Sequence, residues 1–258
     1  MPSASLPILT YHSIDDSGSV ISIAPALFRQ QMAYLAEYGW QTLTLSEAVR
    51  HLASGRPTPP DAVVLTFDDG FENVYTEAFP VLERYGFRAT VFLITDYCGG
   101  AIDGYGPSAA TGRLPVMDWP AIAEMHAYGV EFGAHTLTHP DLTRLSPQAA
   151  EHEMVTSKTV IQDRLGTTVD VFAYPYGSFN GAVKAIARRH FLSAVSTRLG
   201  RARPRADLHA LCRMDMYYLQ PPWFFKNLSS DVLAAYLRTR QLVRDVKEAA
   251  GVGPGKAA

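Results

Sequence analysis

The chain has 258 residues, of which 47% are hydrophobic and 19% are charged, and its formal net charge is −2. This is the composition of an ordinary globular protein, and the near-neutral charge argues against a nucleic-acid binder built on bulk electrostatics. The two cysteines, Cys98 and Cys212, form no metal or redox spacing, so we do not expect a disulfide framework.

Nothing in the sequence divides the chain, which holds no repeat, no low-complexity tract and no break in composition. We therefore predict a single domain over residues 1–258, with a flexible tail at 250–258. Residues 1–6 lack a basic segment followed by an apolar stretch, and no run is long enough to cross a membrane. These features predict a cytoplasmic location, with no signal peptide and no integral membrane segment.

Strand-like and helix-like patterns alternate about seven times along the chain. Short apolar runs predict strands at residues 7–12, 40–45, 63–69, 88–94, 130–134, 169–173, 191–196 and 211–219. Helical spacing of apolar residues predicts helices at residues 25–38, 46–54, 71–85, 118–128, 146–165, 182–189 and 231–249. The alternation indicates an α/β fold with a parallel sheet, either closed as a barrel or doubly wound.

Some local features refine this pattern. Ser46 is expected to cap the second helix, and Pro80 to kink the third. Residues 95–115 are rich in glycine and show no periodicity, so we expect a long loop there. On the last helix we expect a solvated basic face formed by Arg238, Arg240, Arg244 and Lys247, with contact to a membrane or a partner as the alternative.

In folds of this kind, active groups lie at the carboxyl ends of the strands. Several polar residues fall at or near such ends, namely His12, Asp68, Asp69, His135, Tyr176 and Asp215. Their shared location predicts that they meet in one site.

Two adjacent acids, Asp68 and Asp69, end a buried apolar strand and are followed by Gly70. Neighbouring carboxylates at such a place repel each other and resist desolvation, so a cation or a catalytic role is expected. A helix N-cap would explain one of the two. Adjacent residues on a regular strand point to opposite faces, so the chain must turn here if both acids serve one site, and Gly70 allows such a turn.

Two histidines, His135 and His139, are four residues apart. On a helical turn they would share a face and reach one metal ion, whereas the alternative is a pair of solvated loop histidines. With a carboxylate from Asp69 they would leave an open position on the ion, which is a catalytic coordination pattern. Asp68 would then be free to act as a general base.

Three segments carry a family resemblance: residues 66–70 (TFDDG), 135–139 (HTLTH) and 174–177 (YPYG). In this order they resemble the first three motifs of the polysaccharide deacetylases, the NodB-homology or carbohydrate esterase family 4 group. The resemblance covers about residues 7–218. It implies a distorted (β/α) barrel of about seven parallel strands and one divalent metal ion, usually zinc, with Co²⁺ and Ni²⁺ as alternatives.

The resemblance also implies roles for single residues. Asp68 corresponds to the base, and Asp69, His135 and His139 correspond to the metal ligands. The backbone N–H of Tyr176 corresponds to the group that holds the oxyanion. Pro175 and Gly177 would line the same groove.

The chain departs from the family pattern at two places. Ala173 occupies the position of an arginine that normally orients the base, and Arg213 is our candidate replacement, with an ordinary surface arginine as the alternative. The Leu-x-His motif near the C-terminus, whose histidine acts as general acid, is missing. His12 resembles the arrangement in the circularly permuted branch that deacetylates poly-N-acetylglucosamine, so we assign it as general acid. A structural role for His12, or His209 as the acid, remain alternatives.

The resemblance implies a metal-dependent hydrolase that removes N-acetyl groups from an N-acetylated saccharide, releasing acetate and a free amine. Two other functions stay open: hydrolysis of another non-peptide C–N bond, as in a cyclic amide or imide, and sugar binding without catalysis. Further substrate contacts are predicted from Asp215 and from aromatic side chains that could stack on sugar rings, namely Trp119, Tyr97 and Tyr105.

Overall fold

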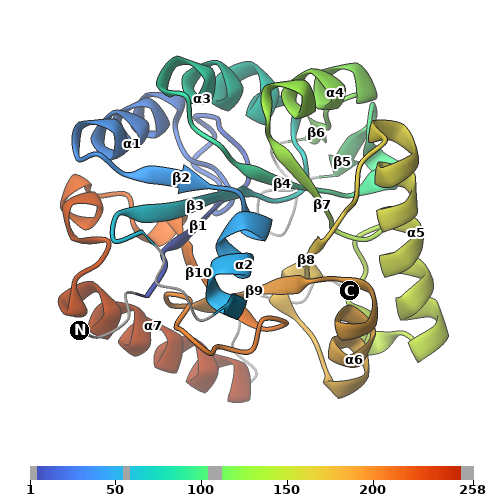
Figure 1. Ribbon diagram of the computed structural model, residues 1–258. Helices are drawn as coiled ribbons and strands as arrows, with labels where there is room; N and C mark the ends of the chain where they lie inside the picture. The colour runs from blue at the N-terminus through green and yellow to red at the C-terminus, as the bar shows by residue number, and fades with distance from the viewer. Residues whose placement is uncertain (1–4, 55–58, 104–111, 251–258) are drawn as a thin grey trace.

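The computed structural model describes residues 5–54, 59–103 and 112–250 (Figure 1). Parallel strands close into a barrel in the order β1-β10-β9-β8-β7-β4-β3, and the pairing of β1 with β3 completes the ring. The strands are β1 (Ile8–Tyr11), β3 (Ala62–Phe67), β4 (Thr90–Leu93), β7 (Glu131–Ala134), β8 (Val171–Ala173), β9 (Ser193–Leu199) and β10 (Leu211–Asp215). The predicted (β/α) barrel is confirmed, and of the two arrangements left open by the alternation it is the closed one. Residues 251–258 of the predicted tail, and Tyr105, lie outside the described residues.

The distortion of the barrel comes from β2 (Gln41–Leu43), which does not join the ring. It pairs with the first residues of β3, where Gln41 lies beside Ala62, while β4 pairs with the last residues, where Thr66 lies beside Thr90. Two strands therefore share one edge of β3. The eight predicted strands thus give a ring of seven.

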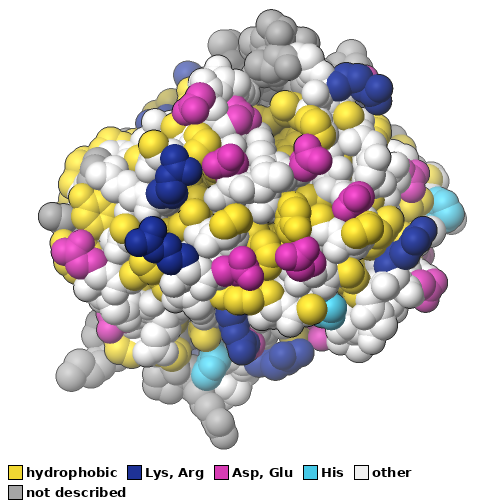
Figure 2. Space-filling model, turned by 90° about the horizontal axis from the view of Figure 1, so that it is seen from above, with side chains coloured by type: hydrophobic (Ala, Val, Ile, Leu, Met, Phe, Trp, Pro, Cys, Tyr) yellow, Lys and Arg dark blue, Asp and Glu magenta, His cyan; other side chains and the backbone are white. Residues whose placement is uncertain are grey.

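Helices surround the barrel (Figure 1). They are α1 (Pro25–Glu37), α3 (Phe79–Tyr85), α4 (Trp119–Tyr128), α5 (Pro147–Leu165), α6 (Gly181–His190) and α7 (Asp231–Ala249). Seen from above, the face over α1, α3 and α4 carries acidic side chains interspersed with apolar and basic ones (Figure 2). Among the described residues, no helix is long and apolar enough to span a bilayer.

The remaining helix, α2 (Leu45–Ser54), lies across the end of the barrel where the strands begin (Figure 1). Its buried residues, Leu45, Val49 and Leu52, belong to one apolar cluster with strand residues such as Val64 and Leu211. This helix closes the amino end of the barrel, so a site for a ligand can form only at the carboxyl end.

The start of α2 corrects one prediction. The helix begins at Leu45, and Thr44 rather than Ser46 caps it. The Glu47 N–H donates to Thr44 Oγ1 over 3.3 Å, and the Thr44 N–H donates to the Glu47 carboxylate over 2.9 Å. This reciprocal pair is a capping box, and its Thr-x-x-Glu pattern is present in the sequence.

Two connections differ from prediction. The ends of the expected loop at 95–115 pair as an antiparallel ribbon of β5 (Ala101–Asp103) and β6 (Arg113–Pro115), so that loop prediction is wrong at both ends. The last strand stops at Asp215, not at 219, because the Asp215 side chain accepts the N–H of Tyr217 over 3.0 Å and starts a 3₁₀ turn. The high glycine content of 95–115 made the two short strands look like a loop. At Asp215, a local side-chain hydrogen bond ended the strand although its apolar pattern continued.

The helix predicted over 71–85 forms, but its irregularity lies upstream of the expected position. A π-helical turn, Val74–Ala78, precedes α3, and Pro80 then falls in the first turn of α3, where proline is tolerated.

Candidate active site at the carboxyl end of the barrel

The chain turns sharply where β3 ends. Asp69 has φ 70° and Gly70 has φ 72°, so the left-handed turn predicted at Gly70 begins one residue earlier, at Asp69. A Cβ at Gly70 would lie 2.8 Å from the end of the Leu93 side chain, which would have to shift to admit any other residue. Because of this turn, Asp68 and Asp69 both lie buried at the same end of the barrel.

Asp69 meets the two histidines of the HxxxH motif. Its Oδ1 lies 3.5 Å from His135 Nε2 and 3.7 Å from His139 Nε2, and the ligand atoms of the three residues lie within 4.8 Å of one another. His135 Nδ1 lies 2.7 Å from the carbonyl oxygen of Ala173. A carbonyl can only accept a hydrogen bond, so Nδ1 carries a proton and Nε2 faces Asp69.

The two histidines lie on a loop, not on the helical turn that their spacing suggested. Thr136 and His139 both have positive φ, 72° and 62°. The Thr136 hydroxyl donates to the His135 carbonyl and accepts the N–H of His139 over 3.0 Å. Glu153 on α5 accepts the N–H of Leu137 over 2.9 Å. No sequence pattern pointed to Glu153, whereas Thr136 lies inside the HxxxH motif itself.

The three residues fit a divalent cation. One carboxylate oxygen and two imidazole nitrogens are a donor set for zinc and similar ions, and their buried side chains exclude the solvated-loop alternative. Burial, together with the charge of His135, lowers the pKa of His139 to about 4, so that ring is neutral near pH 7. Burial would raise the pKa of Asp69, but the hydrogen bond from His135 and the nearby histidine charges lower it overall.

Asp68 is held by Arg213 from β10. The guanidinium donates from Nη1 to Oδ1 over 2.7 Å and from Nη2 to Oδ2 over 2.6 Å, while Nε donates to the Ser196 carbonyl over 3.0 Å. Burial would raise the pKa of Asp68, but the charge and hydrogen bonds of Arg213 hold it well below its usual range. With 1% of its surface exposed, Arg213 is not the surface arginine of the alternative interpretation.

Thr66 is a further partner that the sequence did not reveal. Arg213 Nη1 lies 3.2 Å from Thr66 Oγ1, whose hydroxyl donates to the carbonyl of Leu9 over 2.8 Å. Thr66 lies on β3 two residues before Asp68, which directly follows the strand, so the alternation of side chains points both into the barrel. That alternation is the signal that could have found it.

His12 follows β1, which lies between β3 and β10 in the ring. Its Nε2 lies 3.7 Å from Asp68 Oδ2, and its side chain is partly exposed. His209 instead precedes β10, at the amino end of that strand, and its Nε2 lies 2.9 Å from the Phe191 carbonyl oxygen. The fold therefore brings His12, and not His209, to the acids.

The turn Pro175–Gly177 follows β8 and forms part of the rim. Tyr176 has φ 58°, and its half-exposed ring lies 4.6 Å from the His139 ring, centroid to centroid. A Cβ at Gly177 would lie 2.4 Å from the backbone nitrogen of Thr197, so glycine alone fits. From this turn a groove of about 320 Å³ extends along Thr197 to Arg244 on α7.

Two of the predicted substrate contacts, Asp215 and Trp119, are placed differently, and Tyr97 is partly buried against the core. Asp215 pairs with Thr10 across β1 and β10, and its pKa is raised by burial and partly lowered by the charge of His12, which places it near that histidine. Trp119 packs against the core at the start of α4, with the Arg164 guanidinium 5.3 Å from its ring centroid. Contact of either residue with a substrate stays a prediction.

Two imidazoles and a carboxylate that could hold a metal ion, with a second carboxylate beside them, are an arrangement typical of hydrolases. A family model described as polysaccharide deacetylase matches residues 55–195. The putative polysaccharide deacetylase YxkH of Bacillus subtilis (strain 168) is 32% identical over 212 residues, 82% of this chain and 71% of that protein. The chain belongs to the polysaccharide deacetylase family, as its three motifs predicted.

Two further comparisons agree. The structure of the Streptococcus pyogenes deacetylase PplD in complex with acetate superposes with a TM-score of 0.73 at 29% identity, over 83% of this chain and 93% of that one. The poly-beta-1,6-N-acetyl-D-glucosamine N-deacetylase of Escherichia coli (strain K12) is 33% identical over 84 residues, 31% of this chain. The chain spans only 12% of the length of that enzyme.

Proposed function

We propose that the chain is a metal-dependent N-deacetylase that hydrolyses the acetamido group of an N-acetylated saccharide. The observation that carries the proposal is Asp68, a buried carboxylate that is fixed by Arg213 next to the Asp69–His135–His139 group without belonging to it. A metal ligand set and a separate, oriented base are the two parts that hydrolysis of an amide needs.

Asp69, His135 and His139 would hold the ion, and their one oxygen and two nitrogens favour Zn²⁺, with Co²⁺ or Ni²⁺ as alternatives. When bound, such an ion supplies a polarised carbonyl oxygen and a water of lowered pKa. The residues of the chain then position the substrate and move the protons.

Asp68 accepts a proton from the attacking water. Both of its oxygens are held by Arg213, so the carboxylate keeps one orientation and stays ionised before the reaction. As the water oxygen bonds to the acetyl carbon, charge develops on the carbonyl oxygen, and the backbone N–H of Tyr176 is our candidate for stabilising it.

His12 protonates the departing nitrogen. Its position 3.7 Å from Asp68 sets the acid beside the base, and its partial exposure leaves it within reach of a substrate at the barrel mouth. The C–N bond breaks, the proton passes from the imidazolium to the amine, and the products are acetate and a free amino sugar. Acid and base thus act on the same acetamido group.

The saccharide part of the proposal is supported by the relatives, whose names describe deacetylases of polysaccharides and of poly-N-acetylglucosamine. The half-exposed ring of Tyr176 at the rim offers an apolar face on which a sugar ring could stack. The cytoplasmic location stays a prediction from the sequence.

Acetate release from N-acetylglucosamine oligomers, measured together with metal content, tests the proposal. We expect acetate release that stops when a chelator removes the ion. Turnover of cyclic amides without acetate release from sugars would favour the other C–N hydrolase. Binding of the oligomers with no turnover of either substrate by metal-loaded protein would favour a sugar-binding module.

A further inference from the structure

The outward face of α7 is apolar. Its exposed aliphatic side chains are Val232 (72% exposed), Leu242 (64%), Val243 (50%) and Val246 (67%). Elsewhere in the described chain, no helix or strand carries more than one large hydrophobic side chain of comparable exposure. Several such side chains on one helix are typical of a surface that another molecule covers.

The exposed residues repeat with heptad spacing. Val232, Ala235, Thr239, Leu242 and Val246 follow one another at intervals of three and four residues, which places them in one stripe about 21 Å long. Leu233 and Leu237, on the other side of the helix, are buried against the domain. The helix is therefore apolar on two faces, and the fold of one chain covers only one of them.

Two of the four basic residues of α7, Arg240 and Arg244, do not join the predicted solvated face, whereas Arg238 and Lys247 are exposed as predicted. The Arg240 guanidinium lies 4.2 Å from the Tyr218 ring centroid, and Arg244 Nη1 donates to the Thr197 carbonyl over 3.0 Å. Both side chains turn toward the domain, so the exposed stripe itself carries no basic residue.

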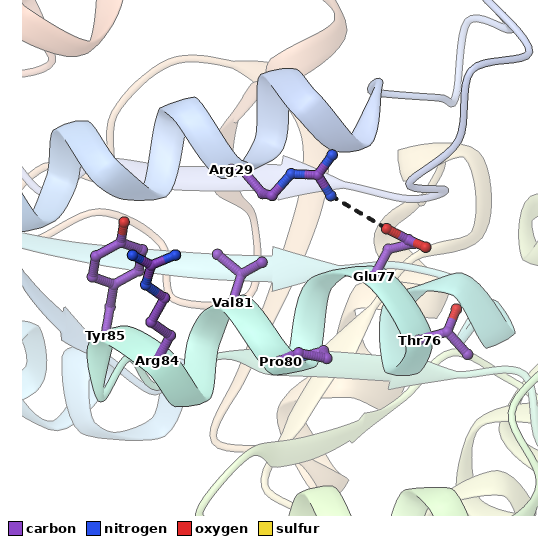
Figure 3. A pocket seen from close by; sticks show the side chains of 7 residues that line it. All are labelled: Arg29, Thr76, Glu77, Pro80, Val81, Arg84 and Tyr85. Carbon is purple, nitrogen blue, oxygen red and sulfur yellow. Dashed lines mark hydrogen bonds and ion pairs between the residues drawn. The ribbon is translucent and has the colours of Figure 1, made fainter.

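Another surface feature differs in character. A groove of about 320 Å³ between α1 and α3 is bridged by the ion pair of Arg29 and Glu77, 3.5 Å apart (Figure 3). Arg29 and Glu77 pair with each other across this groove, so these two charges do not call for a second molecule.

We propose that α7 packs against α7 of a second copy of this chain, antiparallel about a two-fold axis. A two-fold axis brings the same patch of both copies together, so the patch must complement itself. One flank of the stripe carries Arg238 and Asp245, seven residues apart. When Thr239 lies opposite Leu242 of the other copy, Arg238 lies within about 3 Å, along the helix axis, of Asp245 of that copy. The symmetry creates this favourable pair twice.

Charge also selects this register over its neighbour. Sliding one helix by a heptad would set Arg238 beside Arg238 and Asp231 beside Asp245 of the other copy, which are like-charge pairs. The other flank, with Tyr236 and Val243, is apolar in either case. An anionic lipid surface is a poorer match, because acidic residues alternate with Arg238 on the charged flank.

The first test is the oligomeric state. Sedimentation velocity of the full chain across roughly 1–100 μM is expected to show a concentration-dependent dimer. Leu242→Glu should weaken it at least about tenfold, whereas Val20→Glu, which changes an exposed aliphatic residue in a loop, should not. A monomer at every concentration, or a dimer unaffected by Leu242→Glu, would overturn the proposal. Binding to anionic vesicles by a protein that stays monomeric would assign the face to a lipid surface instead.

A charge exchange tests the register. Arg238→Glu and Asp245→Lys should each weaken the dimer, and the double variant should recover it, because the exchange restores both pairs. Arg198 lies 3.5 Å from Asp245 within the same chain, so unfolding temperatures are measured for all variants to separate folding from association. No recovery in a folded double variant would exclude this register.

Cross-linking tests the direction of the helices. In the proposed register Ala235 lies opposite Val246 of the other copy, while like residues lie about 16 Å apart along the axis, beyond disulfide reach. Oxidation of mixed Ala235→Cys and Val246→Cys proteins should give the mixed dimer, and each variant alone should give none. Cross-links within each variant alone would show parallel helices and overturn the proposal.

Discussion

The two ends of the barrel are built on the same strands by opposite means. At the amino end, α2 adds Val49 and Leu52 to an apolar cluster, and its first turn is capped by Thr44. At the carboxyl end, Asp68 and Arg213 are buried among other charged groups, and the backbone adopts left-handed conformations. Apolar burial stabilises the amino end. The carboxyl end holds desolvated charges, which are tolerated only because each has a partner.

The difference predicts that substitutions at the two ends separate activity from stability. At the carboxyl end, we expect large losses of activity, and a loss of stability only where a buried charge loses its partner. At the amino end, we expect changes in stability with unchanged catalytic constants.

The largest effect is expected at the proposed metal ligands. His135→Ala removes one nitrogen donor, so metal content and activity should fall together, with activity reduced by roughly 10³-fold or more. Metal analysis of the purified variant, beside acetate release, measures both quantities. If His135→Ala kept its full metal content and activity, the ligand assignment would be wrong.

Asp68→Asn separates the base from the metal. The amide cannot accept the proton, so kcat should fall by roughly 10²–10⁴-fold while metal content stays at the level of the unchanged protein. Asp69→Asn is the matched control one residue away, and it should lose metal. Full activity in Asp68→Asn would refute the assignment of the base.

Arg213→Met should cost about 3–5 kcal/mol in the free energy of unfolding, because it leaves the Asp68 carboxylate buried without its partner. Arg213 holds the pKa of Asp68 below its usual range, so the pair stabilises the fold above the unfolded pKa of aspartate and this contribution is lost in strong acid. The deficit of Arg213→Met should therefore grow as pH rises from strong acid through the normal aspartate range. Denaturant unfolding at several pH values measures it, and Asp68→Asn in the same chain should recover part of the loss.

Arg213 also shows what the sequence could not predict. The sequence could predict that Asp68, Asp69, His135 and His139 meet, because each of their motifs lies at the end of a predicted strand and such ends meet in a parallel barrel. Arg213 and Asp68 are 145 residues apart, and their contact exists only because β1 closes the ring between β3 and β10. The sequence could propose Arg213 from the missing arginine at Ala173, but it could not derive the two hydrogen bonds.

Local competition explains the other errors. The Thr-x-x-Glu pattern of the capping box at Thr44 is present in the sequence, but the prediction placed the cap at Ser46. The strand ends at Asp215, whose carboxylate accepts a local hydrogen bond, although the apolar pattern of the sequence continues beyond it. The left-handed backbone at Thr136 and His139 brings both imidazole rings to Asp69. Helix and strand propensities do not predict such a loop conformation.

At the amino end, Leu52→Ala should lower the free energy of unfolding by about 2–3 kcal/mol, because Leu52 is part of the apolar cluster beneath α2. It should leave kcat unchanged, because this cluster lies at the opposite end of the barrel from the proposed reacting groups. Thermal unfolding and acetate release on the same sample measure the two effects. A selective loss of kcat in a stable Leu52→Ala protein would show that the two ends are coupled.

The smallest effect is expected at Glu131, an acid buried at the amino end. Burial raises the pKa of its carboxyl group, even though the Ser46 N–H and the Thr90 hydroxyl donate to it over 3.2 and 2.8 Å. Since the folded pKa lies above the unfolded value, the native state loses stability as pH rises from the unfolded pKa through the folded one. Glu131→Gln keeps an oxygen that can accept both hydrogen bonds and has no charge to bury. It should therefore be neutral or stabilising at pH 7, by at most about 1 kcal/mol, and should flatten the pH dependence of unfolding in the carboxyl range. Destabilisation of Glu131→Gln at pH 7 would mean that the amino end, like the carboxyl end, depends on a paired charge.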